Sequence, residues 1–127
     1  INNIKIWPHD IRLIISDFKN AFFDKIFIIH PDPWQKNKHK KRRILQQGLL
    51  DSLSRVLKKN GTIVISTDEI KMKSWILEQF HVRTDFEWQV DHLNEIFNKP
   101  DEFVQSKYSK KAIREKKNIN WFFFKKK

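Results

Sequence analysis

The chain lacks cysteine entirely and has only two glycines among its 127 residues. Without cysteine it can form no disulfide, no thiolate metal site and no cysteine nucleophile. Gly48 and Gly61 lie too far apart for a Gly-x-Gly-x-x-Gly turn or a P-loop, so we expect no glycine-rich phosphate cradle within these residues. The five histidines show no metal-ligand spacing, and no metal site is expected. No hydrophobic run reaches the length of a membrane span or resembles a signal peptide, so we expect a soluble, cytoplasmic protein.

Acidic residues are also scarce, with 15 Asp and Glu against 26 Lys and Arg, for a formal net charge of +11. The excess lies in residues 35–43, with six cations and no acid, and in residues 105–127, with nine cations against Glu115 alone. Two basic segments on a slightly acidic remainder indicate a surface for a polyanion. A solvated, lysine-rich surface is the alternative, and we favour it for residues 125–127. We expect Arg42 and Arg43 to open a helix, where positive charge opposes the helix dipole, and this favours a ligand-binding role for them.

The hydrophobic pattern predicts a single α/β domain over residues 1–127. With 11 Phe and 5 Trp, the chain can fill a core. We expect strands at 3–7, 26–29, 62–66, 86–90 and 119–124, with a polar stretch at 107–117, and helices at 11–18, 42–58 and from 68 to about 80. Asn60-Gly61 should stop the second helix, and the third should direct Ile70, Trp75, Ile76 and Phe80 inward. The unbroken run 26–29 indicates a strand buried on both faces, and the order of elements indicates a mainly parallel sheet.

Three aspartates follow three of these expected strands. Asp10 follows residues 3–7, Asp32 follows residues 26–29, and Asp68 follows residues 62–66. In open α/β sheets, ligands bind outside the carboxyl ends of the strands, so the three carboxylates would share one crevice. Aspartate also favours turns and helix caps, which explains any one of them without a ligand. Three in matching positions favour a binding site, with Asp32 fixed by the prolines on either side of it.

The residues around Asp32 carry a family resemblance. The string Pro31-Asp32-Pro33-Trp34, then Lys36, a basic run ending Lys41-Arg42-Arg43-Ile44 and a strand ending Ser66-Thr67-Asp68 together resemble the tRNA (guanine-N7)-methyltransferase family. The resemblance implies a Rossmann-like, class I fold with S-adenosylmethionine as cofactor and tRNA as partner. It also implies methyl transfer to N7 of a guanosine in the variable loop. Trp34 is equally consistent with a platform at the mouth of the crevice and with a core side chain.

The resemblance also implies roles for individual residues. Asp10 and Asp32 would contact the cofactor, with Asp32 as the active-site aspartate, while Lys36 and Asp68 would bind the tRNA substrate. The family's Thr-Lys/Arg-Phe/Tyr-Glu motif falls on Ser106, Lys107, Tyr108 and Ser109, where Ser109 lacks the carboxylate. The remaining cations of the basic run would contact tRNA phosphates without reading sequence: Lys38, Lys40, Lys41, Arg42 and Arg43.

A methyltransferase of this family needs a glycine-rich turn after its first strand and an acidic residue after its second. Residues 3–7 resemble its third strand, so we expect residues 1–127 to be the carboxy-terminal portion of the enzyme and a partial domain. The missing amino-terminal half would then be its partner. Two alternatives remain open. One is a non-catalytic, RNA-binding remnant of such an enzyme, which Ser109 favours, and the other is a different class I methyltransferase.

Overall fold

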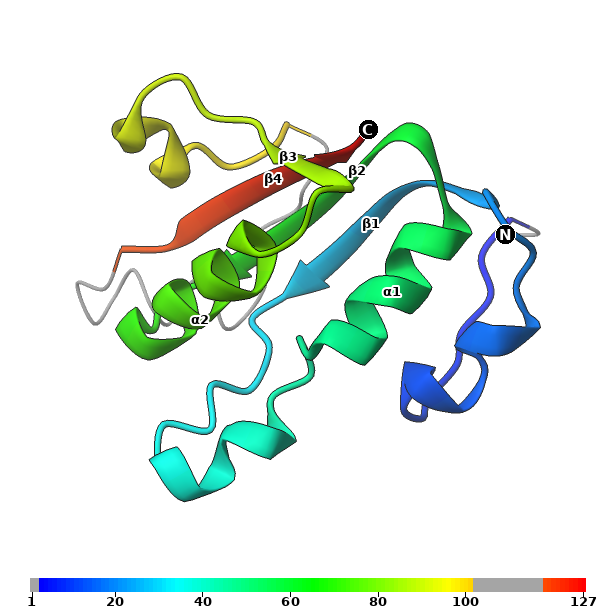
Figure 1. Ribbon diagram of the computed structural model, residues 1–127, viewed down its shortest axis with the longest axis horizontal. Helices are drawn as coiled ribbons and strands as arrows, with labels where there is room; N and C mark the ends of the chain where they lie inside the picture. The colour runs from blue at the N-terminus through cyan, green and yellow to red at the C-terminus, as the bar shows by residue number, and fades with distance from the viewer. Residues whose placement is uncertain (1–2, 102–117) are drawn as a thin grey trace.

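The computed structural model describes residues 3–101 and 118–127 and shows one four-stranded sheet with two helices along one of its faces (Figure 1). The strands are β1 (Phe23–Ile29), β2 (Leu57–Thr67), β3 (Phe86–Trp88) and β4 (Asn120–Lys126), in the order β1-β2-β4-β3. The helices are α1 (Gln47–Val56) and α2 (Ile70–His81). Short 3-10 segments are η1 (Ile11–Leu13), η2 (Ile15–Asp17), η3 (Asn37–Arg42) and η4 (Leu93–Phe97).

The sheet is mixed. β1 pairs with β2 in parallel, whereas β4 runs antiparallel to both β2 and β3. The predicted α/β class is therefore confirmed, and the prediction of a mainly parallel sheet is wrong. Apolar runs such as residues 62–66 and 119–124 indicate burial but carry no information about strand direction, which depends on the path of the connecting chain.

The core lies between the two helices and the sheet. One apolar stripe comes from each helix, and the facing strands supply large aliphatic and aromatic side chains. The buried members are Leu49, Leu50, Leu53 and Val56 of α1, Met72, Ile76 and Phe80 of α2, and Ile63, Ile65, Phe122 and Phe124 of the sheet. The rings of Phe80 and Phe124 stack with centroids 3.7 Å apart. Burying each such side chain contributes about 1.5–3 kcal/mol, so this layer holds α2 on the sheet.

β1 is an outer strand and is buried less than its sequence predicts. Phe27 remains 38% exposed, and Ile26 and Ile28 are only partly buried against the core. The prediction of a strand buried on both faces is wrong. In the part of the chain that the structure describes, β1 has one strand neighbour, β2. Ile26 and Ile28 pack against the core, so Phe27, which lies between them, points to the opposite face of the sheet.

The segment before β1 also differs from expectation. Residues 3–7 form no strand, and Ile4 and Ile6 are 60% and 86% exposed, because no strand among the described residues pairs with them. The helix expected at 11–18 is instead the two 3-10 turns η1 and η2, of which Ile15 is the buried residue. Arg55 of α1 holds this segment by donating hydrogen bonds to the carbonyls of Ile15 and Phe18.

The helices begin and end at other residues than predicted. α1 starts at Gln47, so Arg42 and Arg43 do not open it: Arg42 ends η3 and Arg43 follows it. The two arginines therefore do not oppose the dipole of α1, and the prediction that they open a helix is wrong. Asn60 has the expected left-handed φ of 67°, but it lies four residues beyond the end of α1, within β2. Ile70 is 81% exposed rather than inward, because the buried stripe of α2 is Met72, Ile76 and Phe80.

The last strand fastens the end of α1. The Lys126 ammonium donates hydrogen bonds of 2.6 and 2.8 Å to the carbonyl oxygens of Ser54 and Leu57. Carbonyls near the end of a helix have no partner within it, and a lysine there also complements the helix dipole. Lys126 therefore has a structural role, unlike the solvated surface we expected of residues 125–127. The polar stretch predicted at 107–117 lies outside the described residues.

Gly61 provides a test of the packing where β2 departs from regular pairing. Phe23 pairs with Leu57 and Lys25 with Thr62, so the four residues 58–61 of β2 lie opposite the single residue Asp24 of β1. A Cβ on Gly61 would lie 2.8 Å from the Leu57 side chain and the Lys58 carbonyl oxygen. We expect Gly61→Ala to destabilise the protein by about 1–3 kcal/mol through overpacking. Gly48→Ala is the matched control: its Cβ would meet no atom within 4 Å, and it should stabilise α1 by up to about 1 kcal/mol. Urea unfolding measures both, and equal effects would contradict the packing account.

Candidate functional site

The chain leaves β1 through a loop that we call the Pro-Asp-Pro-Trp loop, residues 30–35. Its first residue is tied to the neighbouring strand, because the His30 amide donates hydrogen bonds to the backbone oxygen and the Oγ of Ser66, at 3.0 and 3.2 Å. His30 and Trp34 have positive φ angles of 46° and 42°. Such angles cost free energy in residues other than glycine and persist only where surrounding contacts enforce them. The loop therefore has a defined path.

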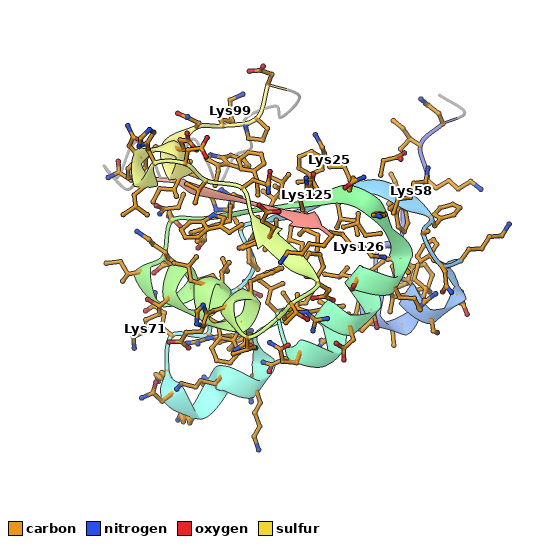
Figure 2. All side chains as sticks on the ribbon, turned by 45° about the horizontal axis from the view of Figure 1, so that its top comes forward. Lys25, Lys58, Lys71, Lys99, Lys125 and Lys126 are labelled. Atoms are coloured by element: carbon orange, nitrogen blue, oxygen red, sulfur yellow. The ribbon has the colours of Figure 1, made fainter. Side chains whose placement is uncertain are left out.

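Three consecutive carbonyl oxygens of this loop are bound by cationic side chains. Arg43 donates from Nε to Pro33 at 2.8 Å and from its terminal NH2 to Trp34 at 3.2 Å. Lys71 of α2 donates from Nζ to Gln35 at 2.8 Å. Figure 2 shows Lys71 at the end of the molecule where the loop and η3 lie, away from the other labelled lysines. These bonds turn the backbone of residues 33–35 inward, toward the protein.

Arg43 is itself enclosed. The residue is only 3% exposed, and its guanidinium lies 4.8 Å from the ring of Trp75, whose indole N–H donates to the Leu45 carbonyl. The sequence placed Arg43 with the cations that contact tRNA phosphates. The structure instead buries it against the loop and α2, so we do not retain it in the proposed RNA surface.

Asp32 and Asp68 lie just beyond the carboxyl ends of two neighbouring strands. Ile29 pairs with Ser66 in the parallel register, so the residues just beyond β1 and β2 share one edge of the sheet. Asp32 is exposed and Asp68 is half-buried. Neither carboxylate has a hydrogen bond or ion pair to any residue of the described ranges 3–101 and 118–127. Both are therefore available to a ligand.

Asp10 does not join them. Its carboxylate caps η1 and forms an ion pair with Arg12, and these bonds lower the pKa of Asp10 from 3.8 to about 2. The segment that carries it lies on the side of the molecule away from the Pro-Asp-Pro-Trp loop (Figure 1). The structure thus brings two of the three aspartates together, because residues 3–7 do not form the strand that would have placed the third. A cofactor role for Asp10 stays a prediction.

Five exposed cations follow the loop, and we call them the basic strip: Lys36, Lys38, Lys40, Lys41 and Arg42. None of the five forms an ion pair with a described residue. The Arg42 guanidinium lies 5.1 Å from the ring of Trp34, and His39 meets the same ring edge-on at 5.6 Å. Trp34 is half-buried beneath these side chains and is not one of the core residues. The strip therefore leaves unpaired positive charge beside Asp32.

Other predicted features fall outside this site. Ser106, Lys107, Tyr108 and Ser109 are not among the described residues.

Within the described ranges, no three or more His, Asp or Glu side chains gather as metal ligands would. No helix in those ranges has the length and hydrophobicity that a bilayer span requires.

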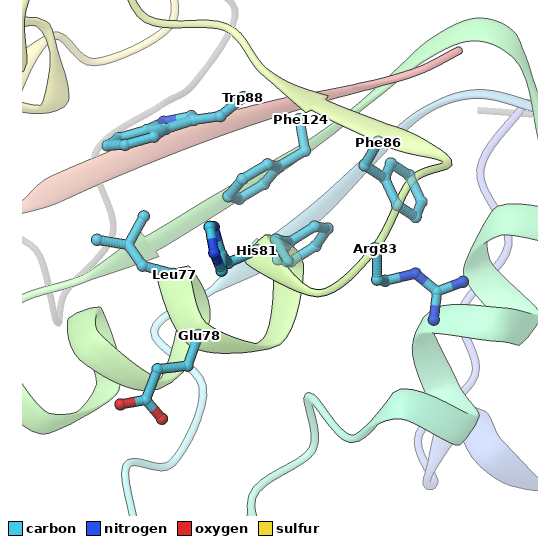
Figure 3. A pocket seen from close by; sticks show the side chains of 8 residues that line it. Leu77, Glu78, His81, Arg83, Phe86, Trp88 and Phe124 are labelled. Carbon is cyan, nitrogen blue, oxygen red and sulfur yellow. The ribbon is translucent and has the colours of Figure 1, made fainter.

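A cavity that the sequence did not predict lies away from the loop. It has a volume of about 460 Å³ between the end of α2, β3 and β4, and Figure 3 shows aromatic side chains around it, including Phe86, Trp88 and Phe124. Arg83 at its border is held by Asp51 and Asp85, at 2.8 and 2.7 Å. The cavity is apolar and distant from the free carboxylates, so it adds nothing to the chemistry of Asp32 and Asp68. The aromatic residues clustered at 86–88 and 121–124 are the sequence feature that could have indicated this cavity.

The half-buried imidazole of His30 predicts a pH effect on stability. Burial lowers the pKa of His30 below 6.5, and the nearby Asp68 charge opposes that shift only partly. The unfolded chain therefore binds more protons than the folded one just below pH 6.5, and stability falls as the pH drops through this region. We expect His30→Asn, which tolerates a positive φ, to reduce the loss of unfolding free energy between pH 7.5 and pH 5.5. His81→Asn, an exposed residue at the end of α2, is the control, and an equal effect of both would contradict the assignment.

The chain is similar to a known protein family and to several individual methyltransferases. A family model described as "Putative methyltransferase" matches residues 1–121. A tRNA (guanine-N(7)-)-methyltransferase of Zymomonas mobilis subsp. mobilis is 32% identical over 123 residues, which cover 97% of this chain and 53% of that protein. One of the same description from Rhodospirillum rubrum is 27% identical over 114 residues, covering 90% of this chain and 45% of that protein.

Two further proteins match as well. A bifunctional methyltransferase of Rickettsia typhi is 33% identical over 122 residues, covering 95% of this chain and 23% of that protein. Among solved structures, a SAM-dependent methyltransferase from Archaeoglobus fulgidus matches with a TM-score of 0.49 and 14% identity, over 98% of this chain and 69% of that one. The chain spans about half the length of the curated tRNA methyltransferases it matches.

Proposed function

Because the chain belongs to the methyltransferase family whose model spans residues 1–121, we propose that it forms the substrate-binding part of a tRNA (guanine-N7)-methyltransferase that uses S-adenosylmethionine. One observation supports this most directly: the uncommitted carboxylate of Asp32 lies on a fixed loop, immediately followed by the basic strip. A site that methylates a nucleobase needs both a means of orienting the base and cations that hold the nucleic acid backbone.

The basic strip fits a phosphate backbone. Unpaired lysines on an exposed segment can neutralise phosphates and release condensed counterions, which drives binding without reading sequence. Lys36 is the member nearest to Asp32 in the chain, so it would hold the nucleotide that enters the site. Trp34 and Arg42 already stack on each other and add a planar surface at the same place.

The proposed chemistry asks little of the protein by way of proton transfer. S-adenosylmethionine, when bound, supplies an electrophilic methyl group on a sulfonium. Guanine N7 carries a free lone pair and no proton, so Asp32 is not required as a general base. Its work is to orient the reactants and to stabilise the positive charge that spreads into the methylated ring. The defined path of residues 30–35 suits that role, because an aligned carboxylate must not reorganise during the reaction.

Asp68 suits recognition of the guanine ring. An ionised carboxylate only accepts hydrogen bonds, and the N–H groups of guanine donate them. The described residues also fit part of the methyl donor, since Asp32 offers free acceptor oxygens for its donor groups. Asp10 offers fewer, because Arg12 occupies its carboxylate.

The role of Asp32 is tested by methyl transfer. We expect Asp32→Asn to abolish transfer of labelled methyl groups to tRNA while changing the tRNA Kd by no more than a few fold, because the carboxylate acts on the reacting base rather than on phosphates. The assay uses residues 1–127 joined to the part of the Zymomonas mobilis relative that they do not match. Asp17→Asn, an exposed aspartate in η2, is the control. Unchanged transfer by the Asp32 variant would refute the role. Absence of transfer by the parent protein, with tRNA binding retained, would favour a non-catalytic RNA-binding role.

The basic strip is tested by the salt dependence of tRNA binding. Replacing Lys38 and Lys40 with Gln should lower the magnitude of the slope of log K against log salt by roughly 0.7–0.9 for each charge removed. Lys19→Gln with Lys59→Gln removes two exposed charges outside the strip and should leave the slope unchanged. Equal slopes for the two double variants would show that the basic strip is ordinary solvated surface and does not bind tRNA phosphates.

A further inference from the structure

We propose that Arg43 and Lys71 are positioning residues, which fix the direction of the Asp32 carboxylate by holding the three carbonyl oxygens that follow it in the chain. The inference deepens the proposed function and rests on it. Residues 33, 34 and 35 all turn their carbonyls toward these two side chains, at 2.8, 3.2 and 2.8 Å. Asp32, which precedes them, is exposed and forms no hydrogen bond or ion pair with a described residue.

The loop needs such restraint because its backbone is strained at both ends. His30 and Trp34 each adopt a left-handed φ, and the two prolines between them have no N–H to donate. The hydrogen bonds from the His30 amide to Ser66 fix only the first residue of the loop. The cations at residues 43 and 71 therefore supply the restraint on the far side of Asp32.

Arginine is required at residue 43. One planar guanidinium reaches two successive carbonyls and stacks on Trp75 at 4.8 Å, which a lysine ammonium could not do together. Burial of this charge is expensive unless its donors are satisfied, so the carbonyls and the cation hold each other in place. Neither a phosphate-binding role nor a solvated surface explains a residue that is 3% exposed within a run of exposed cations.

The adjacent arginines should respond in opposite ways when each is replaced by methionine. Arg42→Met removes an exposed charge and should lower the magnitude of the slope of log K against log salt for tRNA binding by roughly 0.7–0.9. Arg43→Met should leave that slope unchanged. In the joined protein described above, Arg43→Met should lower kcat for methyl transfer by roughly 100-fold, since a small misplacement of an aligned group can cost that much, with the tRNA Kd within a few fold. Arg43→Lys should not restore kcat.

Arg83→Met separates positioning from general loss of structure. Arg83 is another largely buried arginine, bound to Asp51 and Asp85, and it lies outside the loop and the basic strip. At a temperature where circular dichroism shows both variants folded, Arg83→Met should leave kcat within a few fold of the parent. An equal fall in kcat for the Arg83 and Arg43 variants would refute the positioning role, and so would normal kcat in Arg43→Met.

A readout that needs no activity keeps this inference distinct from the proposed function. In residues 1–127 labelled with fluorotryptophan, the resonances of Trp34 and Trp75 should move in Arg43→Met while those of Trp88 and Trp121 stay, and millimolar guanidinium should move them back. If the parent protein transfers no methyl group but these resonances respond, the proposed function fails and the restraint on the loop stands. If the Trp34 resonance does not move, the inference itself is overturned.

Discussion

The parallel pairing of β1 with β2 decides the arrangement of the whole candidate site. Its register sets Ile29 beside Ser66, so the chain leaves both strands at the same edge of the sheet. The His30 amide then binds Ser66, and the loop is directed from that edge toward the start of α2. Asp32 and Asp68 lie at the same edge of the sheet because these two strand ends are neighbours. A shift of this register by one residue would move the loop away from Lys71 and turn the alternating side chains of β1 to the other face.

Positively charged side chains serve two different purposes in residues 36–43. Lysines and Arg42 keep their charge in water, where it costs little and remains available to an anion. Arg43 gives its charge to backbone carbonyls in a nearly dry environment, where the hydrogen bonds are stronger and leaving them unmade is costly. The difference comes from burial and not from residue type, since Arg42 and Arg43 are adjacent. A basic run in a sequence therefore indicates charge but does not say which member of the run carries structure.

The middle of the chain was predictable from its sequence and the amino-terminal segment was not. Residues 63–66 are fully buried within β2 and residues 70–81 form α2, because their apolar patterns match the sheet and the helix that bury them. Residues 3–7 carry a similar apolar pattern, yet Ile4 and Ile6 are exposed. A strand is stable only when another strand accepts its backbone hydrogen bonds, and no described segment does so for residues 3–7. Local pattern cannot report the presence of that neighbour.

The family resemblance, the loop at residues 30–34 and the position of Asp32 and Asp68 after two strands could all be read from the sequence, because proline geometry and apolar runs are local properties. The packed fold was needed to show that Asp10 is bound to Arg12, that Arg43 is buried against the loop, and that Lys71 holds the loop from α2. Each of these depends on which side chains meet across distant parts of the chain. A charged residue can be satisfied by water, by a ligand or by a carbonyl oxygen, and the choice among them follows from burial, which the packed structure alone sets.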